Sequence, residues 1–308
     1  MTLTCCDLKI ILKKDLKSLF VSDLFFESIC DDLSHKIGVD GMDEETNRKI
    51  NTKDNVRVVT KDEFITAQLN LSLKARKLLY LAIAQCRMGD NEFYTYSIDA
   101  VEFAKMIGVL PRSVYRRVSE LSEELMKSFI KVKDDTGKKF TMYALFSMCK
   151  YSDGVLTFKM NADMSDLLLN LKKSFTQPFL ADFLKMRSCY TISVWHLFQS
   201  KMESKIPGLT ESIDFDVWVD ELRQATGTEH KFKQIAKLKE KVLDMAIEEI
   251  AEKCLVVVTY SGIKSNRTIV GFRCSATSLF RLSDAEVKKY QKRFNARNRC
   301  VAANLKTE

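Results

Sequence analysis

Apolar residues recur at steps of three and four along several segments of the chain, which is the spacing of a helix that buries one face. In the segment Leu71–Cys86 the apolar stripe consists of Ala75, Leu78, Leu79, Ala82, Ile83 and Cys86. Ser72 stands where its hydroxyl can accept a hydrogen bond from an amide that is otherwise unpaired at a helix start. The pattern therefore predicts a capped, core-facing helix that opens a domain.

The positions after this helix predict a strand, two further helices and a hairpin. The predicted elements are the strand Tyr94–Tyr96, the helix Ile98–Ile107 capped by Ser97, the stop at Gly108, the helix Arg112–Lys127, and the strands Phe129–Lys133 and Phe140–Cys149 around the turn Asp134–Gly137. Val155–Met160 predicts another strand, and Asp163–Leu171 predicts a short helix. A strand is also expected at Val56–Thr60.

The same order of elements recurs later in the chain. Its predicted members are the helix Ile192–Met202, the strand Ser212–Phe215, the helix Asp216–Ala225, the turn at Gly227, the helix Lys231–Ile250, and the strands Leu255–Tyr260 and Thr268–Cys274 around the turn Ser261–Asn266. A helix-turn-helix followed by a β-hairpin is a winged helix. The sequence thus predicts a helix-rich α+β fold with two tandem winged-helix domains, and Trp195 and Trp218 are expected in the core of the second.

The predicted domain boundaries follow from changes in this patterning. Residues 1–55 are expected to form an N-terminal extension, amphipathic up to residue 37 and then a polar linker over Gly38–Asn55. Residues 56–172 and 173–280 are expected to form the two winged-helix domains. Residues 281–308 are expected to be a basic C-terminal tail.

The formal net charge of +8 is modest, so the placement of basic residues is more informative than their number. Arginine can pair with guanine edges, while lysine suits phosphate. The predicted DNA contacts are Arg112, Ser113, Arg116 and Arg117 in the first domain, Lys231, Lys233, Gln234, Lys237 and Lys241 in the second, and Lys138, Lys139, Lys264 and Arg267 at the hairpin tips. Either basic helix alone is equally typical of a solvated surface, but their recurrence at one position of both units favours DNA binding.

Signatures of catalysis and metal binding are missing from the sequence. The three histidines are far apart, the nine cysteines form no CxxC pair, and neither a GxxxxGK[ST] phosphate loop nor a GxSxG motif occurs. We therefore expect a protein that is not an enzyme and has no cofactor and no metal. The scattered cysteines favour a reduced, cytoplasmic protein, and no apolar run approaches membrane-spanning length.

The run Asn70–Leu79, followed by Ala82-Ile83-Ala84, resembles the opening of theta-type plasmid replication initiators, the iteron-binding Rep family. The stretches Phe175–Leu197 and Phe232–Glu249 are similar to later parts of the same family, although Trp195 stands where the family pattern prefers Leu or Tyr. The resemblance covers about residues 56 to 275 and rests on diffuse aliphatic patterns.

The resemblance implies two winged-helix domains without a catalytic site. It further implies that monomers bind direct repeats, or iterons, in double-stranded DNA at a plasmid origin, help to open the origin, and attract host replication proteins such as the replicative helicase. Dimers of such proteins often repress their own gene. No membrane partner is implied.

Two other functions stay open at this point. One is a sequence-specific transcription regulator without a role in replication. The other is a nicking or strand-transfer enzyme that uses a tyrosine, which the lack of paired histidines disfavours.

Overall fold

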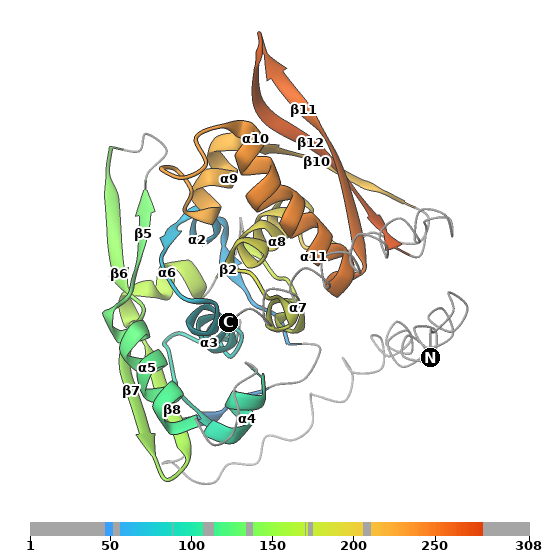
Figure 1. The fold of residues 1–308 in the computed structure, drawn as a ribbon. Helices are drawn as coiled ribbons and strands as arrows, with labels where there is room; N and C mark the ends of the chain where they lie inside the picture. Colours follow the sequence, from blue (N-terminus) through green and yellow to red (C-terminus); the bar gives the residue numbers. More distant parts are fainter. Residues whose placement is uncertain are drawn as a thin grey trace, which may run out of the picture. The chain divides into compact units, whose positions relative to one another are not determined.

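The structure is a computed structural model that describes residues 47–51, 56–87, 89–106, 114–133, 138–169, 171, 175–205 and 211–279 (Figure 1). Several predicted features lie outside these residues: the amphipathic segment 1–37, Gly108, Arg112, Ser113, the turn Asp134–Gly137 and the tail 281–308. Among the described residues, no helix is long and apolar enough to cross a membrane.

Helix α3 (Leu73–Ile83) is the most deeply buried element of the first winged helix. Every residue from Ala75 to Ile83 is buried, so the helix packs on all sides rather than along one stripe. The predicted cap is confirmed, since the Ser72 hydroxyl accepts a hydrogen bond from the Ala75 amide at 3.3 Å. The same hydroxyl donates to Glu124 at 2.8 Å, which ties α3 to helix α5 (Val114–Lys127).

The main sheet of this domain has the order β1-β4-β8-β7. Its strands are β1 (Asn47–Lys49), β4 (Thr95–Asp99), β7 (Phe146–Ser152) and β8 (Val155–Met160). β4 and β7 both pair antiparallel with β8, and β1 pairs parallel with β4. The predicted strand Val155–Met160 is confirmed, whereas the predicted linker contains β1 and so contributes to the sheet.

The predicted hairpin of the first domain is divided between two sheets. Strands β5 (Phe129–Lys133) and β6 (Phe140–Ala144) pair with each other and, through β5, with β3 (Gln68–Leu69). The predicted strand Phe140–Cys149 was wrong in its length, because the fully buried Leu145 separates β6 from β7. The hairpin in the wing position is β7–β8, joined through Asp153-Gly154, and it pairs with β4 through β8; β5–β6 is an additional hairpin.

The second winged helix keeps the predicted order of elements. It comprises α8 (Cys189–Lys201), β10 (Ile213–Trp218), α9 (Val219–Thr226), α10 (Ile235–Leu238), the π-helical turn η4 (Lys239–Leu243), α11 (Asp244–Cys254), β11 (Val256–Ser265) and β12 (Thr268–Ser278). The strands form an antiparallel sheet in the order β10-β12-β11. The tandem winged-helix α+β fold is thereby confirmed.

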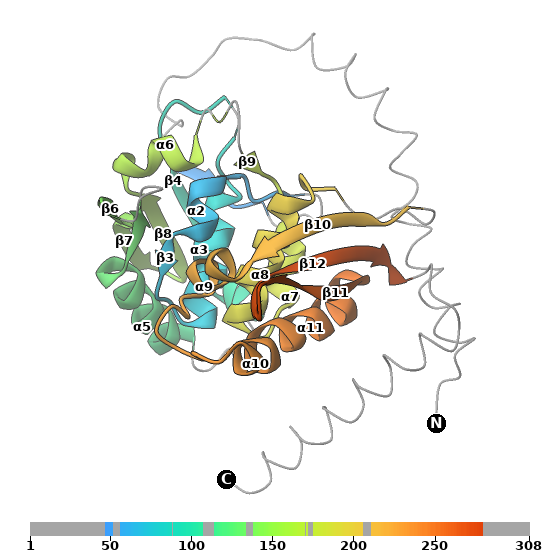
Figure 2. The same ribbon diagram turned by 90° about the horizontal axis from the view of Figure 1, so that it is seen from above.

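The second helix of the first winged helix is α4 (Ala100–Met106). Shorter elements precede α3, namely β2 (Thr60–Lys61) and α2 (Asp62–Thr66), or follow β8, namely η3 (Ala162–Met164), α6 (Ser165–Leu168), β9 (Phe175–Thr176) and α7 (Leu180–Lys185). β2 and β9 pair antiparallel, which joins residues that precede α3 to residues that follow β8. Figure 2 shows α3 and α8 close together between the two sheets.

Three local predictions were wrong. α4 begins two residues later than predicted, and its first amides donate to the Asp99 carboxylate rather than to Ser97. α9 begins at Val219 because β10 continues through Trp218. Trp218 is 44% exposed rather than in the core, and its ring covers Gly271, where an added Cβ would lie 2.8 Å from it. Trp195 is 1% exposed, as predicted.

A buried histidine connects α8 to the first winged helix. His196 Nε2 lies 2.9 Å from Thr60 Oγ1, and its Nδ1 lies 2.8 Å from Tyr80 Oη. Burial and, secondly, the nearby charge of Arg76 lower the pKa of His196 to about 3. The neutral ring is therefore part of the folded core.

We expect this histidine to destabilise the protein in acid. The unfolded chain takes up a proton here below about pH 6.5, whereas the folded chain stays neutral down to about pH 3. The free energy of unfolding should therefore fall as the pH falls through this window, by up to about 1.4 kcal/mol per pH unit. Urea unfolding between pH 7 and pH 4.5 should show a shallower pH dependence for His196→Gln than for the wild type. Equal pH dependences would contradict this assignment.

Candidate nucleic-acid interface

The third helix of the first winged helix, α5, presents a basic surface opposite its buried side. Val118, Leu121 and Leu125 are buried. The Arg116 and Arg117 side chains are 72% and 45% exposed on the other side. Two of the four contacts predicted on this helix thus reach solvent, while Arg112 and Ser113 lie outside the described residues.

Both exposed arginines are paired with one carboxylate. Glu120 Oε2 lies 2.8 Å from a terminal nitrogen of Arg117, and Glu120 Oε1 lies 3.6 Å from Nε of Arg116. All three side chains are substantially exposed, so the pairs are in contact with water. Cations near a helix N-terminus are unfavourable, because they lie at the positive end of the helix dipole. The negative charge of Glu120 offsets this effect for Arg116 and Arg117.

The corresponding helix of the second domain begins later than predicted. α9 ends at Gly227, whose φ of 63° is in the left-handed region that glycine adopts without strain. The helix then starts at Ile235, so Lys231, Lys233 and Gln234 lie in the preceding turn rather than on a helical face. All three are exposed, but the predicted helix Lys231–Ile250 was wrong in its start, so Lys233 is not on one helix with Lys237 and Lys241.

Arg223 organises this turn, a role that the sequence did not reveal. Its guanidinium donates hydrogen bonds to four backbone carbonyls, those of Thr228, Lys231, Phe232 and Lys233, at 2.8–3.2 Å. Phe232 has a positive φ of 50°, which the surrounding contacts must hold in place. A planar group with several fixed donors suits such a set of acceptors, so Arg223 fixes the segment that carries three of the predicted DNA contacts.

Lys237 and Lys241 occupy the exposed side of α10 and η4. Their side chains are 55% and 50% exposed, whereas Leu238, Val242 and Leu243 are buried. Each ammonium lies 2.9 Å from a different oxygen of Glu240. These two hydrogen-bonded cations lower the pKa of Glu240 to about 2, so the carboxylate is charged at neutral pH.

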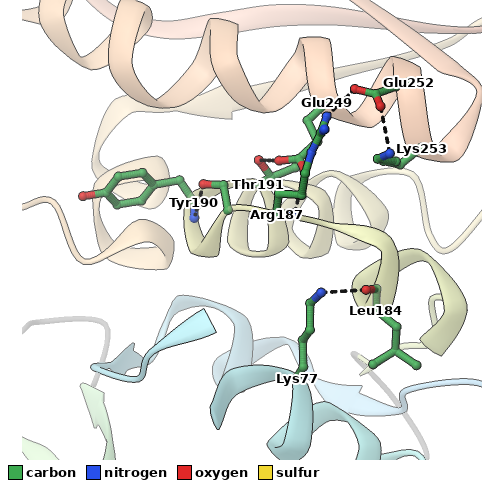
Figure 3. A network of polar contacts seen from close by, with 9 residues as sticks. Lys77, Leu184, Arg187, Tyr190, Thr191, Glu249, Glu252 and Lys253 are labelled. Carbon is green, nitrogen blue, oxygen red and sulfur yellow. Dashed lines mark hydrogen bonds and ion pairs between the residues drawn. The ribbon is translucent and has the colours of Figure 1, made fainter. Parts of the chain in front are cut away.

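A buried carboxylate holds the continuation of this helix against α8 (Figure 3). Glu249 on α11 accepts hydrogen bonds from the Arg187 amide at 2.5 Å and from the Thr191 hydroxyl at 2.6 Å. The Arg187 guanidinium also contacts Glu252, which in turn pairs with Lys253. This network fixes the orientation of α11 on α8, and with it the basic α10–η4 segment at its N-terminal end.

The two hairpins that carry predicted contacts differ in kind. β10 pairs with residues 271–276 of β12, so the turn end of β11–β12 projects beyond it, as Figure 1 shows. The turn is shorter than predicted, because residues 261–265 belong to β11, and Lys264 and Arg267 are exposed near it. Lys138 and Lys139 are also exposed, but on the additional hairpin rather than on the one in the wing position.

Over the part of the chain that the structure describes, no group of His, Cys, Asp or Glu side chains is arranged to hold a metal ion. The cysteines described there are free thiols: Cys86, Cys149, Cys189, Cys254 and Cys274. Burial raises the pKa of each, to about 12 for Cys86. Groups with raised pKa values are mostly protonated at neutral pH and hence poor nucleophiles.

Two winged helices, each with an exposed basic third helix, define the class of DNA-binding helix-turn-helix proteins. Comparison with models of protein families identifies the family within this class. The model described as Initiator Replication protein, WH1, matches residues 57–199, and the model described as Initiator Rep protein, WH2, matches residues 219–274. Together they cover well over half of the sequence, and the chain belongs to the family of plasmid replication initiator proteins.

A solved structure shares the fold. The Pi initiator protein, crystallised in complex with iteron DNA, aligns with 73% of this chain and 98% of its own at 19% identity and a TM-score of 0.59. A selenomethionine derivative of domains 2 and 3 of RctB aligns with 71% of this chain and 82% of its own at 10% identity, with a TM-score of 0.38. A comparison with curated proteins found no match. The predicted division at residues 172/173 stays a prediction; the WH1 model extends to residue 199.

We expect Arg223→Lys to destabilise the second winged helix. A single ammonium cannot serve the four carbonyls that Arg223 contacts, and leaving partly buried acceptors unpaired costs about 1–3 kcal/mol. Urea unfolding should show a loss of that order. Arg273→Lys is the matched control, because Arg273 is 68% exposed and pairs only on the surface with Asp216. That control should cost less than about 0.5 kcal/mol; equal losses in the two variants would contradict the role of Arg223.

Proposed function

We propose that this protein initiates plasmid replication by binding direct repeats at the origin through its two winged-helix domains. The observation that carries the proposal is the exposed cationic surface on the third helix of each winged helix, in a chain of the replication initiator family. The shared fold with the Pi initiator protein, which was crystallised with iteron DNA, supports the same kind of ligand. The predicted contact residues are proposed to bind that DNA.

The remaining steps of initiation are proposed on family resemblance. After binding as a monomer, the protein would promote opening of the origin and recruit host replication proteins, among them the replicative helicase. As a dimer it would repress its own gene. In this proposal the protein acts by binding alone and catalyses no bond cleavage.

Tandem repeats near the gene are the first expectation. Two recognition helices in adjacent major grooves would cover about two helical turns, or roughly 20 bp. Repeats of about this length should flank the gene, and deletion of the gene should abolish maintenance of its plasmid. A regulator without a replication role would leave maintenance intact.

The salt dependence of binding should report the two-helix contact. If about eight phosphates are neutralised, the slope of log K against log salt concentration should be about −7 on a repeat duplex. Fluorescence anisotropy between about 0.05 and 0.3 M salt measures it. A slope near about −2 would mean that only one or two cations contact the backbone and would contradict the proposal.

Two of the arginines predicted to contact DNA in the first domain are expected to read bases. Replacing Arg112 and Arg116 together by alanine should weaken binding to the repeat duplex more than binding to unrelated DNA, because arginine can pair with guanine O6 and N7. The loss should be about 1–3 kcal/mol for each base contact removed. Equal losses on both duplexes would assign these arginines to phosphate.

A further inference from the structure

Each recognition helix carries one glutamate that holds two of the cations assigned to DNA. Glu120 pairs with Arg116 and Arg117 in the first domain, and Glu240 pairs with Lys237 and Lys241 in the second. Each glutamate is about half exposed, at 49% and 52%. The carboxylates thus lie on the same surface as the cations and would meet the same ligand.

The two arrangements are reached by different local geometry. In α5 the arginines precede Glu120 by four and three residues, on a regular helix. In the second domain Lys237, on α10, precedes Glu240 by three residues. Lys241 follows Glu240 directly, and both lie in the π-helical turn η4. The sequence spacing of the glutamate and its cations therefore differs between the two domains. Repetition of one sequence pattern does not explain why one glutamate pairs with two cations in both.

Such a carboxylate competes with DNA phosphate for the same cations. A phosphate at any sequence would have to replace the carboxylate or lie beside it, and like charges held close together are unfavourable. A carboxylate in the major groove can, however, accept a hydrogen bond from the N4 amino group of cytosine. The carboxylate therefore weakens contacts that are made with the DNA backbone alone. Where cytosine is present, the hydrogen bond from its amino group offsets this loss.

We propose that Glu120 and Glu240 determine the specificity of DNA binding, by withholding their cations from phosphates at unrelated sequences and by accepting from cytosine in the cognate site. The inference rests on the proposed function, because it requires that these helices enter DNA grooves. The alternative is that these are ordinary surface ion pairs, which stabilise a helix only slightly and have no bearing on the ligand.

The neutral isosteres Glu120→Gln and Glu240→Gln test the proposal, singly and together. Glu123→Gln is the matched control, since Glu123 pairs with the single cation Lys127 at 2.9 Å on the same helix, in its C-terminal half. Anisotropy would be measured on a repeat duplex and on a scrambled duplex of equal length and composition, over a range of salt. Thermal unfolding would verify that all variants are folded.

The double variant should bind the scrambled duplex about tenfold more tightly, with a steeper salt dependence. Its affinity for the repeat duplex should change less, so the ratio of the two affinities should fall about tenfold. The control should stay within about twofold of the wild type on both duplexes. Replacing C·G pairs of the repeat one at a time should weaken the wild type at a position where the matching alanine variant, Glu120→Ala or Glu240→Ala, is indifferent, because alanine lacks the acceptor that glutamine retains.

Other outcomes separate the two proposals. A wild type that prefers the repeats, with glutamine variants that keep the same ratio of affinities or match the Glu123→Gln control, would overturn the role of Glu120 and Glu240 alone. An equal gain on both duplexes would also overturn it, since the carboxylates would then oppose DNA without selecting sequence. A wild type that shows no preference for the repeats would overturn the proposed function itself.

Discussion

The packing of α3 against α8 is the constraint on which both winged helices depend. Burying two such helices places cations in the core: Arg76 and Lys77 are 7% and 8% exposed. Arg76 donates to Ser193 Oγ on α8, and the Lys77 ammonium donates to the Leu184 carbonyl at 2.6 Å. Burial lowers the pKa of Lys77, as expected for a charge removed from water. Each buried cation is therefore tolerated only when its acceptor is in place. Because Ser193 lies on α8 and Leu184 on α7, the positions of both helices on α3 are specific.

From α8 the same specificity extends to the side of the second domain that is proposed to bind DNA. Glu249 fixes α11 on α8 through Thr191 and the Arg187 amide, and Arg223 fixes the turn before α10. A basic segment that would bind DNA is thus held at both of its ends by buried or partly buried polar contacts. Pre-ordering of this kind reduces the entropy that binding must overcome. The exposed lysines between these anchors keep only their own side-chain freedom.

Much of the architecture could be predicted because it is local. The spacing of apolar residues gave α3, α5 and the repeated order of elements, and Ser72 marked a true helix start. Pairing between distant strands left no such local signal. Nothing in Phe140–Cys149 indicates that Leu145 separates two sheets. The predicted helix Lys231–Ile250 assumed ideal helical geometry, where the chain has a turn, the short helix α10 and then η4. Arg223 and Glu249 were missed because their partners are defined by tertiary structure.

The local charge on the proposed DNA interface also differs from what the composition of the chain suggests. A net charge of +8 spread over the chain gives only a weak attraction to DNA. On the two recognition helices, however, Glu120 and Glu240 each neutralise part of the local positive charge while remaining half exposed. In the proposed function, these carboxylates limit affinity where the helices contact DNA most closely. Sequence preference would then depend on whether the bases present can replace the hydrogen bonds that the paired side chains give up. An initiator that must find a few repeats among an excess of other DNA needs such a ratio of affinities more than it needs strong binding.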